Sequence, residues 1–162
     1  MKQKLLLLNH SILFLGVSIY FGTGWSTYLF DFPVVPKLDV SNYYLHFVPQ
    51  VAAATKFFTV LVPVMILAGI ILAVAEWRTC FRWVPIVVVL AICSASFVTM
   101  HFVFPLNKIM AGPITDPQQL TEVMGKWLQF TRIRIGFWSL EWLTMMYYFA
   151  AKVAAGKGAL EK

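Results

Sequence analysis

The sequence is short of charged residues and of cysteine, and each shortage argues against a class of protein. Only 12% of its 162 residues are charged and 60% are hydrophobic, whereas a soluble domain has about 25% charged and about 45–50% apolar residues. The composition therefore indicates an integral membrane protein, and the length predicts a single domain over residues 1–162. The two cysteines, Cys80 and Cys93, lie far apart and form no Cys-x-x-Cys pair, which disfavours a thiol–disulfide relay.

Metal-binding spacings and internal repeats are also missing. The chain contains no His-x-x-x-His and no Glu-x-x-His pattern, so a metal would need distant ligands such as His46 and His101, joined by Glu141 or Asp39. His10 lies at the opposite end of the predicted fold from these two histidines, which disfavours haem. We expect neither a metal nor another cofactor. The lack of an internal repeat disfavours a transporter that works by alternating access.

The net charge of +6 does not indicate nucleic-acid binding, because the basic residues are scattered among helix ends and loops. Their distribution instead predicts orientation, since cytoplasmic loops carry an excess of lysine and arginine. One side of the predicted fold has seven basic residues: Lys2, Lys4, Arg78, Arg82, Lys152, Lys157 and Lys162. The other side has four in its loops and helix extensions: Lys37, Lys56, Lys108 and Lys126. We therefore expect a multi-pass protein of a bacterial inner membrane with both termini in the cytoplasm.

The hydrophobic runs predict an all-α protein, a bundle of four transmembrane helices over about residues 5–30, 41–76, 84–104 and 117–152. The first run is longer than the apolar part of a signal peptide, so we expect it to be a retained span. Ser41 is the expected N-cap of the second helix, and Asp116, followed by Pro117, is that of the fourth. Pro105 is expected to end the third helix. The second and fourth helices are predicted to extend beyond the outer surface.

The predicted fourth helix carries charged residues into the membrane. Such residues cost about 2.5–3.5 kcal/mol each on insertion scales, so they normally face a bundle interior or a wet cavity. At a rise of about 1.5 Å per residue, Arg134 is expected near the outer edge of the hydrocarbon and facing inward, whereas Arg132 could simply reach the headgroups. Glu141 is expected near the midplane, where it either handles a proton or makes a structural hydrogen bond.

Polar and aromatic residues of three predicted helices fall at similar depth in the outer half of the bundle. The second helix contributes His46 and Gln50, and the third contributes His101 and Asn107. Aromatic side chains that would surround them are Tyr44, Trp127 and Trp138. We predict a site in which the catalytic residues are His101, Arg134 and Glu141, and in which the substrate-binding residues are His46, Asn107, Trp127 and Trp138.

A short motif within this set resembles a known family. Pro105 and Asn107 form a Pro-x-Asn at the end of the third predicted helix, and Trp127 is followed seven residues later by Arg134. This pattern is similar to that of the anthrone-oxygenase-like family of small four-helix membrane proteins, in which Thr131 would occupy a position that is usually Asn or His. The resemblance implies the same fold. The family is named for fungal enzymes that oxidise a polyketide anthrone to an anthraquinone with molecular oxygen, without an obvious metal or flavin.

This chemistry defines the leading hypothesis, which is cofactor-independent oxidation of an aromatic or quinol-like lipophilic substrate. The reaction begins with loss of an acidic C–H proton, so it needs an aromatic slot, a base such as His101, and donors such as Arg134 and Asn107 for the enolate oxygen. One alternative is a non-catalytic accessory or structural subunit of a larger membrane complex. Another is a small proton-linked transporter or lipid-binding protein that uses Glu141. The lipid bilayer is the partner common to all three.

Overall fold

The computed structural model describes the backbone of residues 2–160 and the side chains of residues 3–155, and it contains no strand in that part of the chain. In chain order the elements are α1 (Lys2–Ser26), the π-helical η1 (Thr27–Asp31), the 3₁₀-helical η2 (Val35–Lys37), α2 (Tyr43–Glu76), α3 (Trp83–Val98), the π-helical η3 (Thr99–Val103), α4 (Phe104–Met110) and α5 (Pro117–Leu160). The all-α prediction is confirmed for the described residues.

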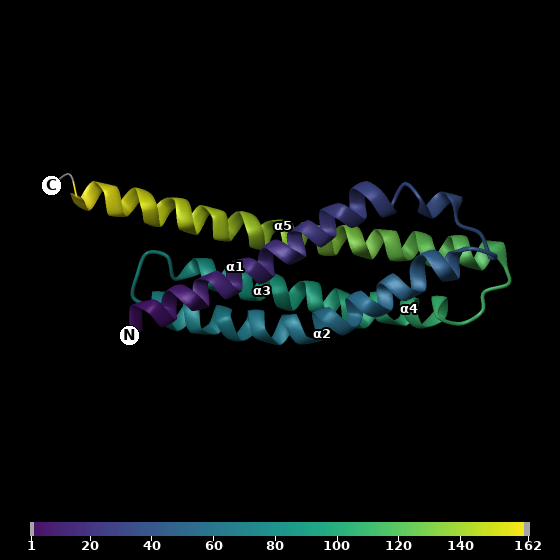
Figure 1. The fold of residues 1–162 in the computed structure, drawn as a ribbon, viewed down its shortest axis with the longest axis horizontal. Helices are drawn as coiled ribbons and strands as arrows, with labels where there is room; N and C mark the ends of the chain where they lie inside the picture. Colours follow the sequence, from purple (N-terminus) through teal and green to yellow (C-terminus); the bar gives the residue numbers. More distant parts are fainter. Residues whose placement is uncertain (1, 161–162) are drawn as a thin grey trace.

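The long helices lie side by side, and successive ones run in opposite directions (Figure 1). α1 packs against α2 and α5, and α3 packs against the same two helices. The start of α1 and the last turns of α5 lie at the same end of the molecule (Figure 1), which we call the terminal end. We call the opposite end, where η1, η2 and α4 lie, the loop end.

Within the described residues, three helical stretches are long and apolar enough to cross a membrane: Gln3–Asp31, Tyr43–Glu76 and Trp83–Met110. Large apolar side chains on these stretches, such as Val60 and Leu90, are more than 60% exposed. Apolar side chains in such positions are unfavourable in water and favourable against acyl chains. The composition and the structure therefore agree on an integral membrane protein in contact with lipid.

The start of α2 differs from the prediction. We expected Ser41 to cap this helix, but the helix begins at Tyr43, and the Ser41 hydroxyl donates to Asp39 Oδ1 at 2.6 Å instead. The same oxygen accepts the backbone N–H groups of Ser41 and Asn42 at 2.8 and 3.1 Å. The hydrogen bond from the Ser41 side chain, with these backbone bonds, lowers the pKa of Asp39 from its usual value. A residue outside the helix therefore stabilises the turn, because an aspartate can accept several N–H groups at once.

The start of α5 matches the prediction. The helix begins at Pro117, and Asp116 Oδ1 accepts the backbone N–H of Gln118 at 2.9 Å. Its end does not match, since α5 continues to Leu160 rather than stopping near residue 152. The first span also differs slightly, because α1 begins at Lys2 and ends at Ser26, after which η1 continues the helical path to Asp31.

The prediction that Pro105 ends the third helix is wrong. The helical path continues from α3 through η3 and α4 to Met110. Pro105 lies in the first turn of α4, and a proline is tolerated in a first turn because its missing N–H has no obligatory partner there. Immediately before α4, the π-helical η3 has one more residue per turn than an α-helix. Its backbone hydrogen bonds therefore join residues five apart instead of four.

Tyr43 fastens the loop between α4 and α5 to the start of α2. Its side chain is 2% exposed, and its hydroxyl donates to the carbonyl of Gly112 at 2.7 Å and accepts the N–H of Ile114 at 3.0 Å. We expect Tyr43→Phe to lower the midpoint of thermal unfolding in detergent, because each buried polar group left without a partner costs about 1–3 kcal/mol. Tyr44→Phe is the matched control, since Tyr44 is 47% exposed. Equal midpoints for the two variants would contradict this role of Tyr43.

Candidate functional site

A cavity of about 1030 Å³ lies among the helices in the half of the bundle nearer the loop end. It is lined by residues of α1, η1, α2, α3, η3, α4 and α5, so all the long helices contribute to its wall. Its polar lining includes Tyr20, Thr23, Asp31, His46, Gln50, Thr55, Thr59, Ser96, Thr99, Asn107, Thr131 and Arg134. Its aromatic lining is Phe47, Phe58, Phe104, Trp127 and Trp138, together with Tyr20. We refer to it as the loop-end cavity.

Three residues of α5 bring unsatisfied polar atoms to this cavity. Thr131, Arg134 and Trp138 follow one another at spacings of three and four, so they lie on one face of the helix. Thr131 is 2% exposed and Trp138 is 4% exposed. Thr131 Oγ1, Arg134 Nε and Trp138 Nε1 are buried, and none of them has a hydrogen-bond partner among the described residues. We call these three residues the α5 row.

The α5 row combines donors with a positive charge. The Arg134 guanidinium lies over the Trp138 ring, with Cζ 4.6 Å from the ring centroid. The ion pairs found among the described residues are Lys126–Glu122 and Lys152–Glu76, so no carboxylate of that part of the chain pairs with Arg134. Buried polar groups in folded proteins are nearly always satisfied, and each exception calls for an explanation. An oxygen of a ligand placed at Arg134 would give Arg134 Nε the partner that it lacks.

Tyr20 connects the α5 row to the aromatic wall. Its ring stacks on Trp138 with centroids 4.8 Å apart, and Phe58 lies 4.8 Å from Tyr20 on the same wall. Tyr20 also lies within electrostatic reach of both Arg134 and Glu141. The stacked rings give this side of the cavity flat apolar surfaces next to a positive charge.

Another part of the wall is fixed by the Asn107–Trp127 pair. Trp127 Nε1 donates to Asn107 Oδ1 at 3.1 Å, which joins α5 to α4. The Trp127 ring is 7% exposed and packs edge-on against Phe47, with centroids 4.6 Å apart. Because Asn107 uses its carbonyl oxygen in this bond, its amide nitrogen is the part that remains for a ligand. The Pro-x-Asn and Trp of the sequence motif therefore hold two helices together at the cavity.

All four residues of the predicted substrate-binding set line the loop-end cavity. His46, Asn107, Trp127 and Trp138 all line it, and so does Arg134 from the predicted catalytic set. Tyr44 is exposed and does not line the cavity. The structure therefore brings these five residues, and Gln50 of α2 with them, to one cavity, while their roles there stay a prediction.

The structure does not bring His101 to the cavity. His101 is exposed, its ring stacks on Phe97 at 4.2 Å between centroids, and its Nδ1 lies 3.1 Å from the Phe97 carbonyl oxygen. The residue count predicts the depth of His101 in the bundle but not the direction of its side chain, because His101 lies inside the π-helical η3. A π turn adds a residue and rotates the helix that follows relative to a regular α-helix. His46 and His101 therefore do not share the cavity as metal ligands.

Glu141 is also separate from the cavity lining. Its side chain is fully buried, and neither carboxylate oxygen has a hydrogen-bond partner among the described residues. It is seven residues beyond Arg134, about 10 Å further along α5, and it does not line the cavity. The structural hydrogen bond considered for Glu141 is therefore not present. Arg132 is exposed with its guanidinium 5.6 Å from the Phe32 ring centroid, so it does not join the α5 row.

Two members of the site were missed at the sequence level. Thr131 counted only as a departure from the family pattern, and Tyr20 was not among the predicted site residues. The signal for Thr131 was its spacing, since it is four residues after Trp127 and three before Arg134. No group of three or more His, Cys, Asp or Glu side chains in the described part of the chain is arranged to hold a metal ion.

The fold and the cavity together define a helical membrane protein with a partly open, ligand-sized cavity among its helices. Comparisons of the chain with protein-family models, with curated proteins and with solved structures found no match. The function is therefore argued from the geometry of the cavity.

Proposed function

We propose that the protein spans a bacterial inner membrane with four helices, α5 being the fourth, and that both termini are cytoplasmic. α5 is antiparallel to α3 and packs against both α1 and α3, which supports a transmembrane position despite its charged residues. The excess of lysine and arginine at the terminal end supports the orientation. In this orientation the loop-end cavity opens in the outer half of the membrane.

We infer that this cavity binds a flat, lipophilic aromatic compound that carries an acidic or carbonyl oxygen. The observation that supports this inference is the α5 row, in which Thr131, Arg134 and Trp138 hold buried polar atoms without partners on the wall of a cavity. An oxygen at Arg134 would accept hydrogen bonds from a charged donor, and such bonds contribute about 1.5–3 kcal/mol each. The stacked rings of Tyr20 and Trp138 provide a matching surface for an aromatic ligand.

The size of the cavity supports a small-molecule ligand rather than a single ion. Ligand pockets usually measure about 300–1,000 Å³ and are mostly apolar with a few polar groups, and the loop-end cavity of about 1030 Å³ is at the upper end of this range. A compound with three fused rings fits within such a volume. Because the walls belong to membrane helices, a lipophilic compound dissolved in the bilayer would reach it without crossing water.

The reaction that we propose for this ligand is oxidation of an anthrone-type methylene to a ketone by molecular oxygen. A base removes one methylene proton, and the resulting enolate reacts with oxygen to form a hydroperoxide. Loss of water then gives the quinone, so one anthrone and one oxygen molecule yield one anthraquinone and one water. Arg134 and Thr131 would hold the enolate oxygen, and His46 replaces His101 as the proposed base because it lines the cavity.

Oxygen uptake by the purified protein tests this proposal. With anthrone as substrate we expect uptake equal to the anthraquinone formed and unaffected by a chelator. His46→Ala should lower the rate by about 10²- to 10⁴-fold, the range for loss of a general base. His101→Ala is the matched control and should keep the rate, since His101 is outside the cavity.

Other outcomes would contradict the proposal in distinct ways. Equal losses in the two histidine variants would exclude His46 as the base, and uptake abolished by the chelator would indicate a metal-dependent reaction. Folded protein that binds anthrone without oxygen uptake would be a binding protein. Folded protein that does not bind anthrone, and that copurifies with a stoichiometric partner in mild detergent, would be an accessory subunit.

A further inference from the structure

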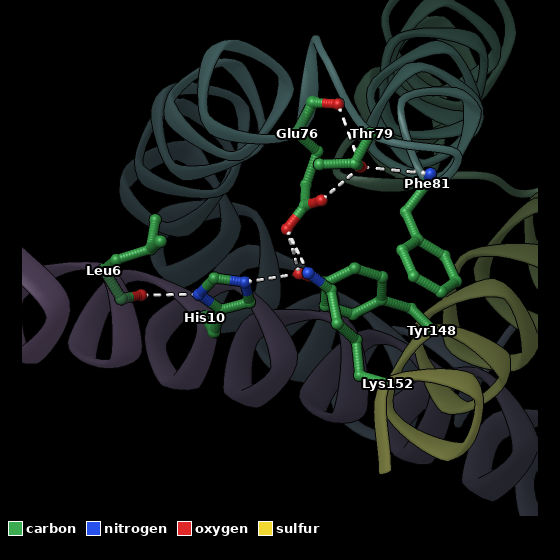
Figure 2. A network of polar contacts seen from close by, with 7 residues as sticks. All are labelled: Leu6, His10, Glu76, Thr79, Phe81, Tyr148 and Lys152. Atoms are coloured by element: carbon green, nitrogen blue, oxygen red, sulfur yellow. Dashed lines mark hydrogen bonds and ion pairs between the residues drawn. The ribbon is translucent and has the colours of Figure 1, made fainter. Parts of the chain in front are cut away.

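A second polar cluster lies at the terminal end, remote from the loop-end cavity and independent of the proposed function. Figure 2 shows His10 of α1, Glu76 of α2 and Tyr148 of α5 in one hydrogen-bonded chain. His10 Nε2 lies 2.8 Å from the Tyr148 hydroxyl, which lies 2.7 Å from Glu76 Oε1. Lys152 Nζ is 2.8 Å from the same carboxylate oxygen, and the Thr79 hydroxyl is 2.5 Å from Glu76 Oε2.

The cluster is buried except at one point. His10 is 9% exposed, Glu76 4% and Tyr148 2%, whereas the Lys152 side chain is 41% exposed. Its Nζ also lies 5.4 Å from the centroid of the Tyr148 ring. α1 packs against α2 and α5, and the titratable groups that these helices bring to His10 are Glu76, Tyr148 and Lys152.

The hydrogen-bond partners determine where the protons lie. His10 Nδ1 is 2.5 Å from the carbonyl oxygen of Leu6, which can only accept, so Nδ1 carries a hydrogen. Glu76 pairs with Lys152 and accepts from Thr79, as an ionised carboxylate does, so Tyr148 donates its single hydroxyl proton to it. The Tyr148 oxygen can then only accept from His10, and Nε2 must carry a hydrogen as well.

We propose that the pair of His10 and Glu76, which Tyr148 connects, binds one proton. His10 is then an imidazolium and Glu76 a carboxylate, so the terminal end is a proton-binding site. Removal of this proton would leave the lone pair of His10 Nε2 facing the oxygen of Tyr148, whose own proton is engaged with Glu76. The contact between α1 and α5 would then lose its central hydrogen bond. Lys152 is the member of the cluster that is exposed to solvent.

Nitrogen NMR of the full-length protein tests the proposal, because the chain contains only three histidines. The protein is labelled with ¹⁵N-histidine, purified without a histidine tag, and measured in detergent at pH 7.5. An ordinary histidine has a pKa of about 6.5 and is about nine-tenths neutral at this pH, so one of its ring nitrogens gives a non-protonated resonance. We expect two protonated nitrogens from His10, whose signals are assigned by comparison of the three His→Gln variants.

Variants of the chain separate the proposal from a purely structural role. Tyr148→Phe should convert His10 to a ring with one non-protonated nitrogen, and Glu76→Gln should do the same if the first variant does not fold. Tyr147→Phe is the matched control, since Tyr147 is 54% exposed, and it should leave the His10 signals unchanged. A non-protonated nitrogen on His10 in the folded wild-type protein at pH 7.5 would overturn the proposal.

Discussion

Arg134→Leu is expected to weaken the binding of an anthrone-type ligand by about 10- to 100-fold, without lowering the stability of the ligand-free protein. A hydrogen bond to a charged group contributes about 1.5–3 kcal/mol, and about 1.4 kcal/mol corresponds to a factor of ten in affinity. In the ligand-free protein Arg134 Nε has no partner among the described residues, so its removal breaks no hydrogen bond of that atom. The loss of the contact with the Trp138 ring is offset because the variant no longer buries a charge. We therefore expect the midpoint of thermal unfolding to stay the same or to rise.

Arg132→Leu is the matched control for this prediction. Arg132 is on the same helix two residues away, but it is exposed and lies over Phe32. We expect it to leave the affinity within about twofold, since exposed charges distant from a ligand contribute little. Fluorescence titration gives the affinity, and thermal unfolding in detergent gives the stability. If Arg134→Leu fails to insert or unfolds at a clearly lower temperature, Arg134 is a structural residue and the ligand proposal loses its main support.

Gly24→Ala is expected to lower the midpoint of thermal unfolding by about 2–12 °C and to weaken ligand binding. α1 and α5 approach closely at Gly24, where an added Cβ would lie 2.6 Å from Trp138 Cε3 and 3.2 Å from Ile135 Cγ1. The indole ring is rigid, so the helices or the ring must move. Overpacking of this kind costs about 1–3 kcal/mol, and about 1 kcal/mol shifts the midpoint by about 2–4 °C in a domain of this size. Binding weakens because Trp138 lines the loop-end cavity.

The same substitution at Gly125 should have the opposite effect on stability. Gly125 is exposed in α5, and a Cβ there would meet nothing within 4 Å. Alanine is favoured over glycine in a helix interior by about 1 kcal/mol, so we expect Gly125→Ala to raise the midpoint by a few degrees. Both variants are measured by thermal unfolding in detergent and by ligand titration. If Gly24→Ala and Gly125→Ala shift the midpoint of thermal unfolding in the same direction, the close approach of Gly24 to Trp138 does not limit the packing of α1 against α5.

The helical fold was predictable from the sequence because hydrophobic length and composition determine which segments enter a membrane. The capping by Asp116 was predictable because an aspartate directly before a proline is a local signal for the start of a helix. The end of the third helix was not, because Pro105 is compatible with either a stop or a first turn, and the π turn that decides between them has no simple sequence signal. Ser41 failed as a cap because its hydroxyl donates to Asp39 Oδ1 instead of accepting a backbone N–H of the first helical turn.

The depth of the site was predictable, whereas the direction of each side chain was less so. A count of residues places Arg134 and Trp138 at the level of Asn107, and the structure brings all three to one cavity. The direction of His101 depends on the local helical twist, which the π turn alters. The cluster of His10, Glu76 and Tyr148 joins residues from three helices that are far apart in the sequence, so only the packing of those helices could reveal it.

A comparison of two ligands tests the central claim most directly. Anthrone and 9,10-dihydroanthracene have the same three-ring skeleton, but only anthrone carries an oxygen. We expect the wild-type protein to bind anthrone about 10- to 100-fold more tightly than 9,10-dihydroanthracene, because only anthrone can accept the charged hydrogen bond from Arg134. We expect Arg134→Leu to bind both compounds with similar, weak affinity. Equal affinity of the wild-type protein for the two compounds, or no binding of either, would contradict the claim that Arg134 holds a ligand oxygen in the loop-end cavity.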